Sequence, residues 1–151
     1  MTIKVKSQEV EDGILITVSG DLDQDLAGFI AEPLQGHAST LIFDLAGIRT
    51  INSLGIHKWL GLMMELQRQK TVRFRNVPHV LLEAANIVAV FFPERSIENV
   101  LLTLECDSCG EQASFPYVRD TIDEADGAVC EACNIPYPTE IEVDHIKKYL
   151  L

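Results

Sequence analysis

The chain has 151 residues, 47% of them hydrophobic, and a formal net charge of -11 at pH 7. This length allows one or two small domains with a packed core. No apolar run reaches the roughly 18 residues that a membrane-spanning helix needs. An acidic chain without clustered Lys and Arg argues against binding to DNA or RNA. The N-terminal segment lacks the apolar stretch of a secretory signal, so we expect a cytoplasmic protein.

The first elements are predicted to be a β-hairpin and a helix. Residues 3–10 alternate weakly, as an edge strand does, and Asp12-Gly13 is a strong hairpin turn signal. Alternating apolar residues predict a second strand over residues 14–18, which Gly20 should end. An acidic beginning and an apolar face then predict a helix over residues 21–35.

Residues 40–69 form the segment around which we expect the fold to be organised. The apolar run 41–45 is typical of a strand buried on both faces, and a loop containing Gly47 should follow it. Apolar residues at helical spacing from Leu54 onward predict an amphipathic helix that begins at Ser53. Ser53 stands where an N-cap is expected, with its hydroxyl near unpaired backbone N–H groups.

The next residues predict further alternation of strands and helices. A strand is expected over residues 71–77, and Pro78 can open a helix over residues 79–87. A short apolar strand over 88–92 and a helix from Ser96 to about residue 102 should follow. This order predicts an α/β fold with a mostly parallel sheet covered by helices.

The composition changes at about residue 105, where we place a boundary between domains 1–104 and 105–151. Aliphatic residues thin out there, and Cys, Pro, Asp and Glu take over. The first part has 12 acidic and 9 basic residues, a net charge of -3, whereas the second has 11 acidic and 3 basic residues, a net charge of -8. This second part holds all four cysteines, and a cytosolic setting favours metal ligation over disulfides.

The cysteines form two CxxC pairs, which predict a small zinc ribbon. Two such knuckles can place four thiolates in a tetrahedron around Zn²⁺, and Gly110 and Asn134 follow the pairs where a left-handed residue is often needed. An iron–sulfur cluster or two disulfides are the alternatives. A redox role for the CxxC pairs would need a thioredoxin-like βαβ pattern around them, which is missing. Because four Cys ligands leave no open position, we expect structural rather than catalytic zinc. The ligands would be Cys106, Cys109, Cys130 and Cys133.

Residues 41–55, LIFDLAGIRTINSLG, resemble the signature of STAS domains, the family of bacterial anti-sigma factor antagonists. Asp44 matches the Asp at the end of the family's strand, Ser53 its phosphorylatable serine and Gly55 the glycine at its helix start. The resemblance implies a STAS-like fold for the first two-thirds of the chain. It also implies a regulatory, non-enzymatic protein whose partner is a serine kinase that sequesters a sigma factor. The docking surface would comprise residues 46–51 and 52–55.

One departure from the family pattern opens an alternative function. The family usually has Asp before the serine, and this chain has Asn52, which keeps the shape of Asp but not its charge. The alternative is a scaffold or adaptor in a bacterial signalling complex that is not phosphorylated, with Ser53 only a helix cap. A zinc-dependent hydrolase would need an open metal position, and nucleic-acid binding by the ribbon is disfavoured by its charge. We therefore expect a protein partner, and neither a nucleic acid nor a membrane.

Overall fold

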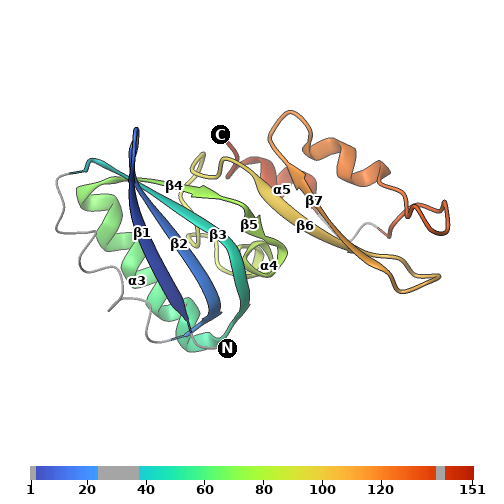
Figure 1. The fold of residues 1–151 in the computed structure, drawn as a ribbon, viewed down its shortest axis with the longest axis horizontal. Coiled ribbons are helices and arrows are strands. Elements are labelled where there is room, and N and C mark those ends of the chain that lie inside the picture. The colour runs from blue at the N-terminus through green and yellow to red at the C-terminus, as the bar shows by residue number, and fades with distance from the viewer. Residues whose placement is uncertain (1–2, 24–37, 139–141) are drawn as a thin grey trace.

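The computed structural model describes residues 3–23, 38–138 and 142–151, and it shows two sheets with helices packed against them (Figure 1). Most of the helix predicted over residues 21–35 lies outside these described residues, and its predicted start is wrong, because residues 21 and 22 belong to a strand. The described elements are β1 (Lys4–Val10), β2 (Gly13–Leu22), β3 (Thr40–Ile51), α3 (Ser53–Gln69), β4 (Thr71–Arg75), β5 (Val77–Pro78), α4 (His79–Ile87), β6 (Val100–Glu105), β7 (Gln112–Tyr117), the 3₁₀ helix η1 (Ile122–Gly127) and α5 (Val143–Lys147).

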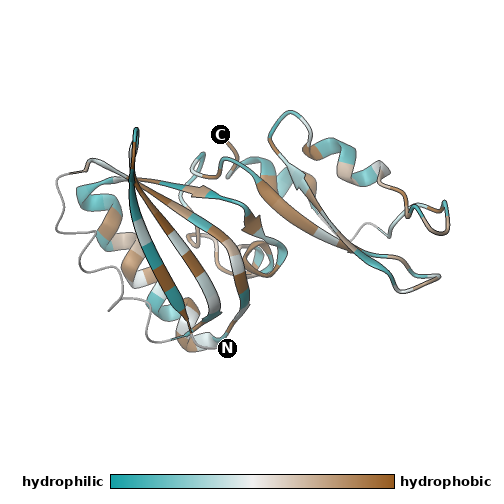
Figure 2. Ribbon diagram, viewed as in Figure 1, coloured by the Kyte–Doolittle hydropathy of each residue, from teal (hydrophilic) through white to brown (hydrophobic). Residues whose placement is uncertain are grey.

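The first sheet has the order β1-β2-β3-β4, and it confirms the predicted α/β fold. The hairpin β1–β2 is antiparallel, whereas β2–β3 and β3–β4 are parallel. A second sheet, β5-β6-β7, combines one parallel and one antiparallel pair. The apolar stripe of α3 is buried at Trp59, Met63 and Leu66, as the helical spacing predicts. Figure 2 shows the matching apolar colour on β2 and β3.

An aromatic cluster joins α3 to the sheet. The indole Nε1 of Trp59 donates a hydrogen bond to the carbonyl of Phe91 at 2.8 Å, and the two rings stack with centroids 5.4 Å apart. Phe43 of β3 and Phe74 of β4 stack at 5.7 Å, and Phe92 meets Phe74 edge to face at 4.9 Å. Each such contact adds about 0.5–1.5 kcal/mol to the free energy gained from burying apolar area.

Two predicted strand ends are wrong, because β2 and β3 both run further. β2 continues past Gly20 to Leu22, and β3 includes residues 46–51, which were predicted to be a loop. Leu22 pairs with Ile51 at the far end of this parallel ladder. Gly47 is not a loop residue: a Cβ there would lie 2.6 Å from the Cβ of Ser19, so glycine allows the two strands to approach.

Two later predictions are also wrong. Residues 88–92 form bends and turns instead of a strand, and the helix expected from Ser96 is absent from this described stretch. The Ser96 hydroxyl donates to the carbonyl of Pro93 at 2.6 Å, within a turn. The following residues alternate in burial, with Val100, Leu102 and Leu104 inside, and form β6. Alternation of buried and exposed residues with a period of two is typical of a strand, and it predicts this segment better than the cap residue Ser96 does.

The C-terminal residues return to the core of the first part of the chain. Ile97 forms isolated bridges to both Phe74 and Leu150, and the backbone N–H of Leu151 donates to the carbonyl of Ile97 at 2.9 Å. The buried ring of Tyr149 lies 6.2 Å from that of Phe92. Residues on both sides of position 105 therefore share one hydrophobic core, while the division into two domains at this position stays a prediction.

The last two residues offer a matched test of this return. Leu150 is fully buried, whereas Leu151 is 46% exposed. We expect Leu150→Ala to lower the free energy of unfolding by about 2–5 kcal/mol, and Leu151→Ala to change it by less than about 0.5 kcal/mol. Urea unfolding measures both free energies. Equal values for the two variants would show that the C-terminus does not complete the core.

Candidate functional site

The start of α3 is capped by Asn52, so the prediction that Ser53 is the N-cap is wrong. The Asn52 side-chain oxygen accepts a hydrogen bond from the backbone N–H of Gly55 at 2.7 Å, and its extended backbone (φ -107°, ψ 176°) is that of an N-cap. Asn and Ser are equally good at this position, and sequence spacing does not separate them. Ser53 is the first residue of the helix, and its side chain is exposed. Within the described residues its hydroxyl makes no hydrogen bond.

Gly55 sets how closely α3 approaches β2. It is buried, and a Cβ on it would lie 2.1 Å from the carbonyl oxygen of Leu22 and 2.7 Å from the carbonyl carbon. The backbone N–H of Asn52 also donates to that oxygen, at 3.4 Å. The glycine of the signature is thus explained by packing: the helix start lies directly on the end of the parallel strand.

Asp44 lies in the first half of β3 and binds the turn between β4 and β5. Its carboxylate accepts hydrogen bonds from the side-chain nitrogen of Asn76, at 3.3 Å to each oxygen, and from the backbone N–H of Ala46 at 3.1 Å. Asn76 has a left-handed backbone (φ 52°) and exchanges hydrogen bonds with Asn99 at 3.1 and 2.9 Å. These contacts join Asp44 to the turn and not to the helix start. No sequence motif includes Asn76, and the general preference of Asn for left-handed backbone is the signal by which it could have been found.

The surface around Ser53 mixes apolar and polar side chains. Leu54 is 52% exposed, and His57 and Lys58 are exposed one turn further along α3. At the adjoining end of β3, Arg49 and Thr50 are exposed. Among these described residues, Leu54 is the one large apolar side chain that is exposed at the helix start.

The cysteines lie on two knuckles with the same hydrogen bonds. In the first, the N–H of Gly110 donates to the carbonyl of Cys106 at 2.9 Å, and the N–H of Cys106 donates to that of Glu111 at 3.0 Å. The residue after each pair is left-handed, with φ of 72° at Gly110 and 57° at Asn134, as predicted. The second knuckle repeats both bonds. The N–H of Asn134 donates to the carbonyl of Cys130 at 2.7 Å, and the N–H of Cys130 donates to the carbonyl of Ile135 at 2.9 Å.

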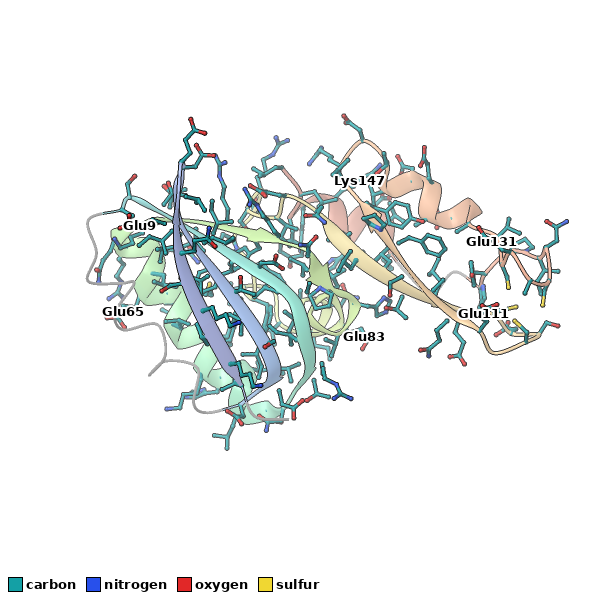
Figure 3. The ribbon with its side chains drawn as sticks, in the orientation of Figure 1. Glu9, Glu65, Glu83, Glu111, Glu131 and Lys147 are labelled. Carbon is teal, nitrogen blue, oxygen red and sulfur yellow. The ribbon has the colours of Figure 1, made fainter. Side chains whose placement is uncertain are left out.

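The four sulfur atoms gather between the two knuckles. All lie within 4.8 Å of one another, and those of Cys109 and Cys130 are 3.8 Å apart. This separation is far longer than the roughly 2.05 Å of a disulfide. It equals the edge of about 3.8 Å that a tetrahedron with metal–sulfur bonds of about 2.3 Å has. Figure 3 shows the sulfur atoms in yellow near Glu111 and Glu131. The four thiols therefore fit a tetrahedral metal ion.

The pKa values of these thiols differ because backbone N–H groups and neighbouring thiols act on each of them to a different extent. Backbone N–H groups of Cys109, and then of Ser108, lower the pKa of Cys106 to about 7. At Cys109 the backbone of Glu111 acts in the same direction, but hydrogen bonding with Cys133 and burial outweigh it and raise the pKa to about 12. Four such neighbours cannot all ionise without a cation, and a bound metal would supply that charge.

Comparison with known proteins shows the fold. No protein-family model and no curated protein matches the chain. It is similar to the crystal structure of an anti-sigma factor antagonist from Mycobacterium paratuberculosis, with a TM-score of 0.52 and 14% identity. The match covers 59% of this chain and 80% of that one. It confirms the predicted STAS-like fold, and the described helices include none long and apolar enough to span a membrane.

Two glycines of α3 give a matched test of the packing at the helix start. Gly55→Ala should lower the free energy of unfolding by about 1–3 kcal/mol, because the new Cβ meets the Leu22 carbonyl. Gly61→Ala should raise it by about 0.5–1 kcal/mol, because a Cβ there meets nothing within 4 Å and alanine favours the helix. Chemical unfolding measures both, and stabilisation by both substitutions would contradict the close packing.

Proposed function

We propose that this protein is a regulatory protein-binding module of the anti-sigma-factor-antagonist type. Its docking surface consists of the helix start, residues 52–55, and the adjoining strand residues 46–51. The STAS-like fold supports this proposal. The observation that carries it is that two different residues act at the helix start. Asn52 caps α3, and the side chain of Ser53 is exposed.

Phosphorylation of Ser53 would switch this surface without unfolding the domain. A phosphate adds a charge of about -1.5 to -2 at pH 7. The N-terminus of a 17-residue helix favours such a charge, and no hydrogen bond among the described residues depends on the hydroxyl. A partner surface complementary to a neutral serine would instead meet a large hydrated anion. Binding would then be lost while the fold persists.

Substitutions at Ser53 test the switch. The wild type, Ser53→Ala and Ser53→Asp are immobilised and used to capture partners from the native cytoplasm, with quantification by mass spectrometry. We expect the wild type and Ser53→Ala to capture a kinase-like anti-sigma factor, and Ser53→Asp to capture at least about tenfold less, a loss of 1.4 kcal/mol or more. The melting temperatures should nearly agree. Equal capture by all three baits would rule out the switch.

A scaffold that is never phosphorylated is the second candidate, and Asn52 favours it. The amide caps the helix as well as an acidic residue would, but it brings no negative charge next to Ser53. In this case, the wild type, Ser53→Ala and Ser53→Asp would capture equal amounts of the same signalling proteins. A phosphoproteomic search of cells for the peptide that contains phosphorylated Ser53 separates the two candidates.

We further propose that the four cysteines hold a structural Zn²⁺. The sulfur spacing and the paired knuckles support a tetrahedral ion, and four thiolates would leave it no open position. Among the described residues, the small apolar cluster beside the knuckles has four buried members, so an ion would supply much of the local stability. Its members are Leu104, Cys106, Cys130 and Tyr137.

Metal analysis and chelation test the zinc centre. The purified protein should contain about one zinc per chain, as expected for a Cys₄ site. A strong chelator should lower the melting temperature and leave most helical circular dichroism, because the larger core has its own buried residues and shares the partly buried Phe115 with the cysteine cluster. Zinc affinity should fall as the pH falls, because protons compete for the thiolates. Metal-free protein with an unchanged melting temperature would refute a structural role.

A further inference from the structure

Among the four cysteines, Cys109 is the one that is exposed to solvent. Cys133 is half-buried, and Cys106 and Cys130 are each 1% exposed. The difference follows from the position of Cys109 in the first knuckle, where residues 107–110 are all exposed. A reagent that approaches from the solvent therefore meets the sulfur of Cys109 first.

The sulfur of Cys109 has a reaction partner on the other knuckle. It lies 3.8 Å from the sulfur of Cys130, and all four sulfur atoms lie within 4.8 Å of one another. A disulfide has a sulfur–sulfur distance of about 2.05 Å, so the two atoms would have to approach by about 1.8 Å. Such a movement is small for an exposed side chain, which changes rotamer readily. An oxidised Cys109 would therefore have a second thiol within reach.

Metal binding would make exposure the property that separates the four sulfur atoms. Cysteines that ligate a metal are thiolates, whatever their pKa values in the metal-free protein. The thiolate is also the form that hydroperoxides oxidise, and susceptibility follows both thiolate character and exposure. In a centre of four thiolates, the exposed Cys109 is thus the expected target. This reasoning rests on the proposed zinc centre.

We propose that Cys109 is a site of reversible oxidation by hydrogen peroxide, and that its oxidation opens the metal centre. The Cys109 thiolate attacks one peroxide oxygen, the O–O bond breaks, hydroxide leaves, and a sulfenic acid forms. The Cys130 thiolate then attacks the sulfur of Cys109, the S–O bond breaks, and a second hydroxide leaves as the disulfide forms. The two sulfur atoms lose two electrons, and the peroxide gains them. Two of the four ligands are consumed, so the Zn²⁺ ion is released.

This oxidation acts on the cysteine knuckles and spares the surface around Ser53. Among the described residues, the cluster beside the knuckles has four buried members, and it loses the ion that stabilises it. The helix that presents Ser53 packs instead on the larger core. Cellular thiols reduce an exposed disulfide of this kind, after which Zn²⁺ can bind again. The metal content of the protein therefore follows the peroxide concentration.

The test treats the zinc-loaded full chain with hydrogen peroxide, and the other three cysteines serve as the internal control. A dimedone probe labels sulfenic acids, mass spectrometry locates the label and the disulfides, and a chromophoric chelator measures released Zn²⁺. We expect at least about tenfold more label on Cys109 than on the buried Cys106. The first disulfide should join Cys109 to Cys130, with one zinc ion released per disulfide. Dithiothreitol and added Zn²⁺ should restore the loaded protein.

Three results would overturn the proposal. The label could be equal on all four cysteines, or the first disulfide could form within one knuckle. The protein could also keep its Zn²⁺ at peroxide concentrations that fully oxidise a free cysteine peptide. Failure of the untreated protein to bind Zn²⁺ is a separate outcome, seen before peroxide is added, and it would refute the metal centre together with this inference.

Discussion

The contact between Trp59 and the segment around Phe91 is the interaction on which the rest of the structure depends. It combines a buried hydrogen bond with ring stacking, and it fixes the inner face of α3 against the aromatic residues of β3 and β4. The same segment continues through Phe92 to Tyr149, next to the C-terminal residues. The helix that presents Ser53 and the chain that returns from the cysteine knuckles therefore meet at one aromatic cluster.

The two candidate sites, the surface around Ser53 and the cysteine knuckles, are stabilised by different interactions. The Ser53 surface is held by the large core and by the close approach of Gly55 to β2, so its shape is fixed before any partner binds. The cysteine knuckles have a small apolar cluster of their own and depend on four thiols that repel one another when ionised. A metal ion would turn this repulsion into attraction. A charge change at Ser53 and a change in metal content should accordingly act on separate parts of the molecule.

Features that depend on local pattern were predictable from the sequence. The first hairpin, the amphipathic α3 and the two knuckles follow from turn residues, helical spacing and CxxC spacing, and the left-handed residues at positions 110 and 134 were expected. Features that depend on distant partners were not. The length of β3 is decided by its pairing with β2, the conformation of residues 88–92 by Trp59, and the position of Asp44 by Asn76. The choice of Asn52 over Ser53 as the cap is a local event between equally good residues, which only geometry resolves.

The central claim is that Ser53 can carry a charge that alters binding and leaves the fold intact. The most direct measurement places phosphoserine at position 53 by genetic incorporation. It compares the phosphorylated protein with the wild type, in thermal unfolding and in capture of the proposed kinase-like partner. The account predicts melting temperatures within about 4 °C of each other, a difference of about 1 kcal/mol or less, together with loss of capture. A phosphorylated protein that unfolds much earlier, or that binds the partner as well as the wild type, would contradict it.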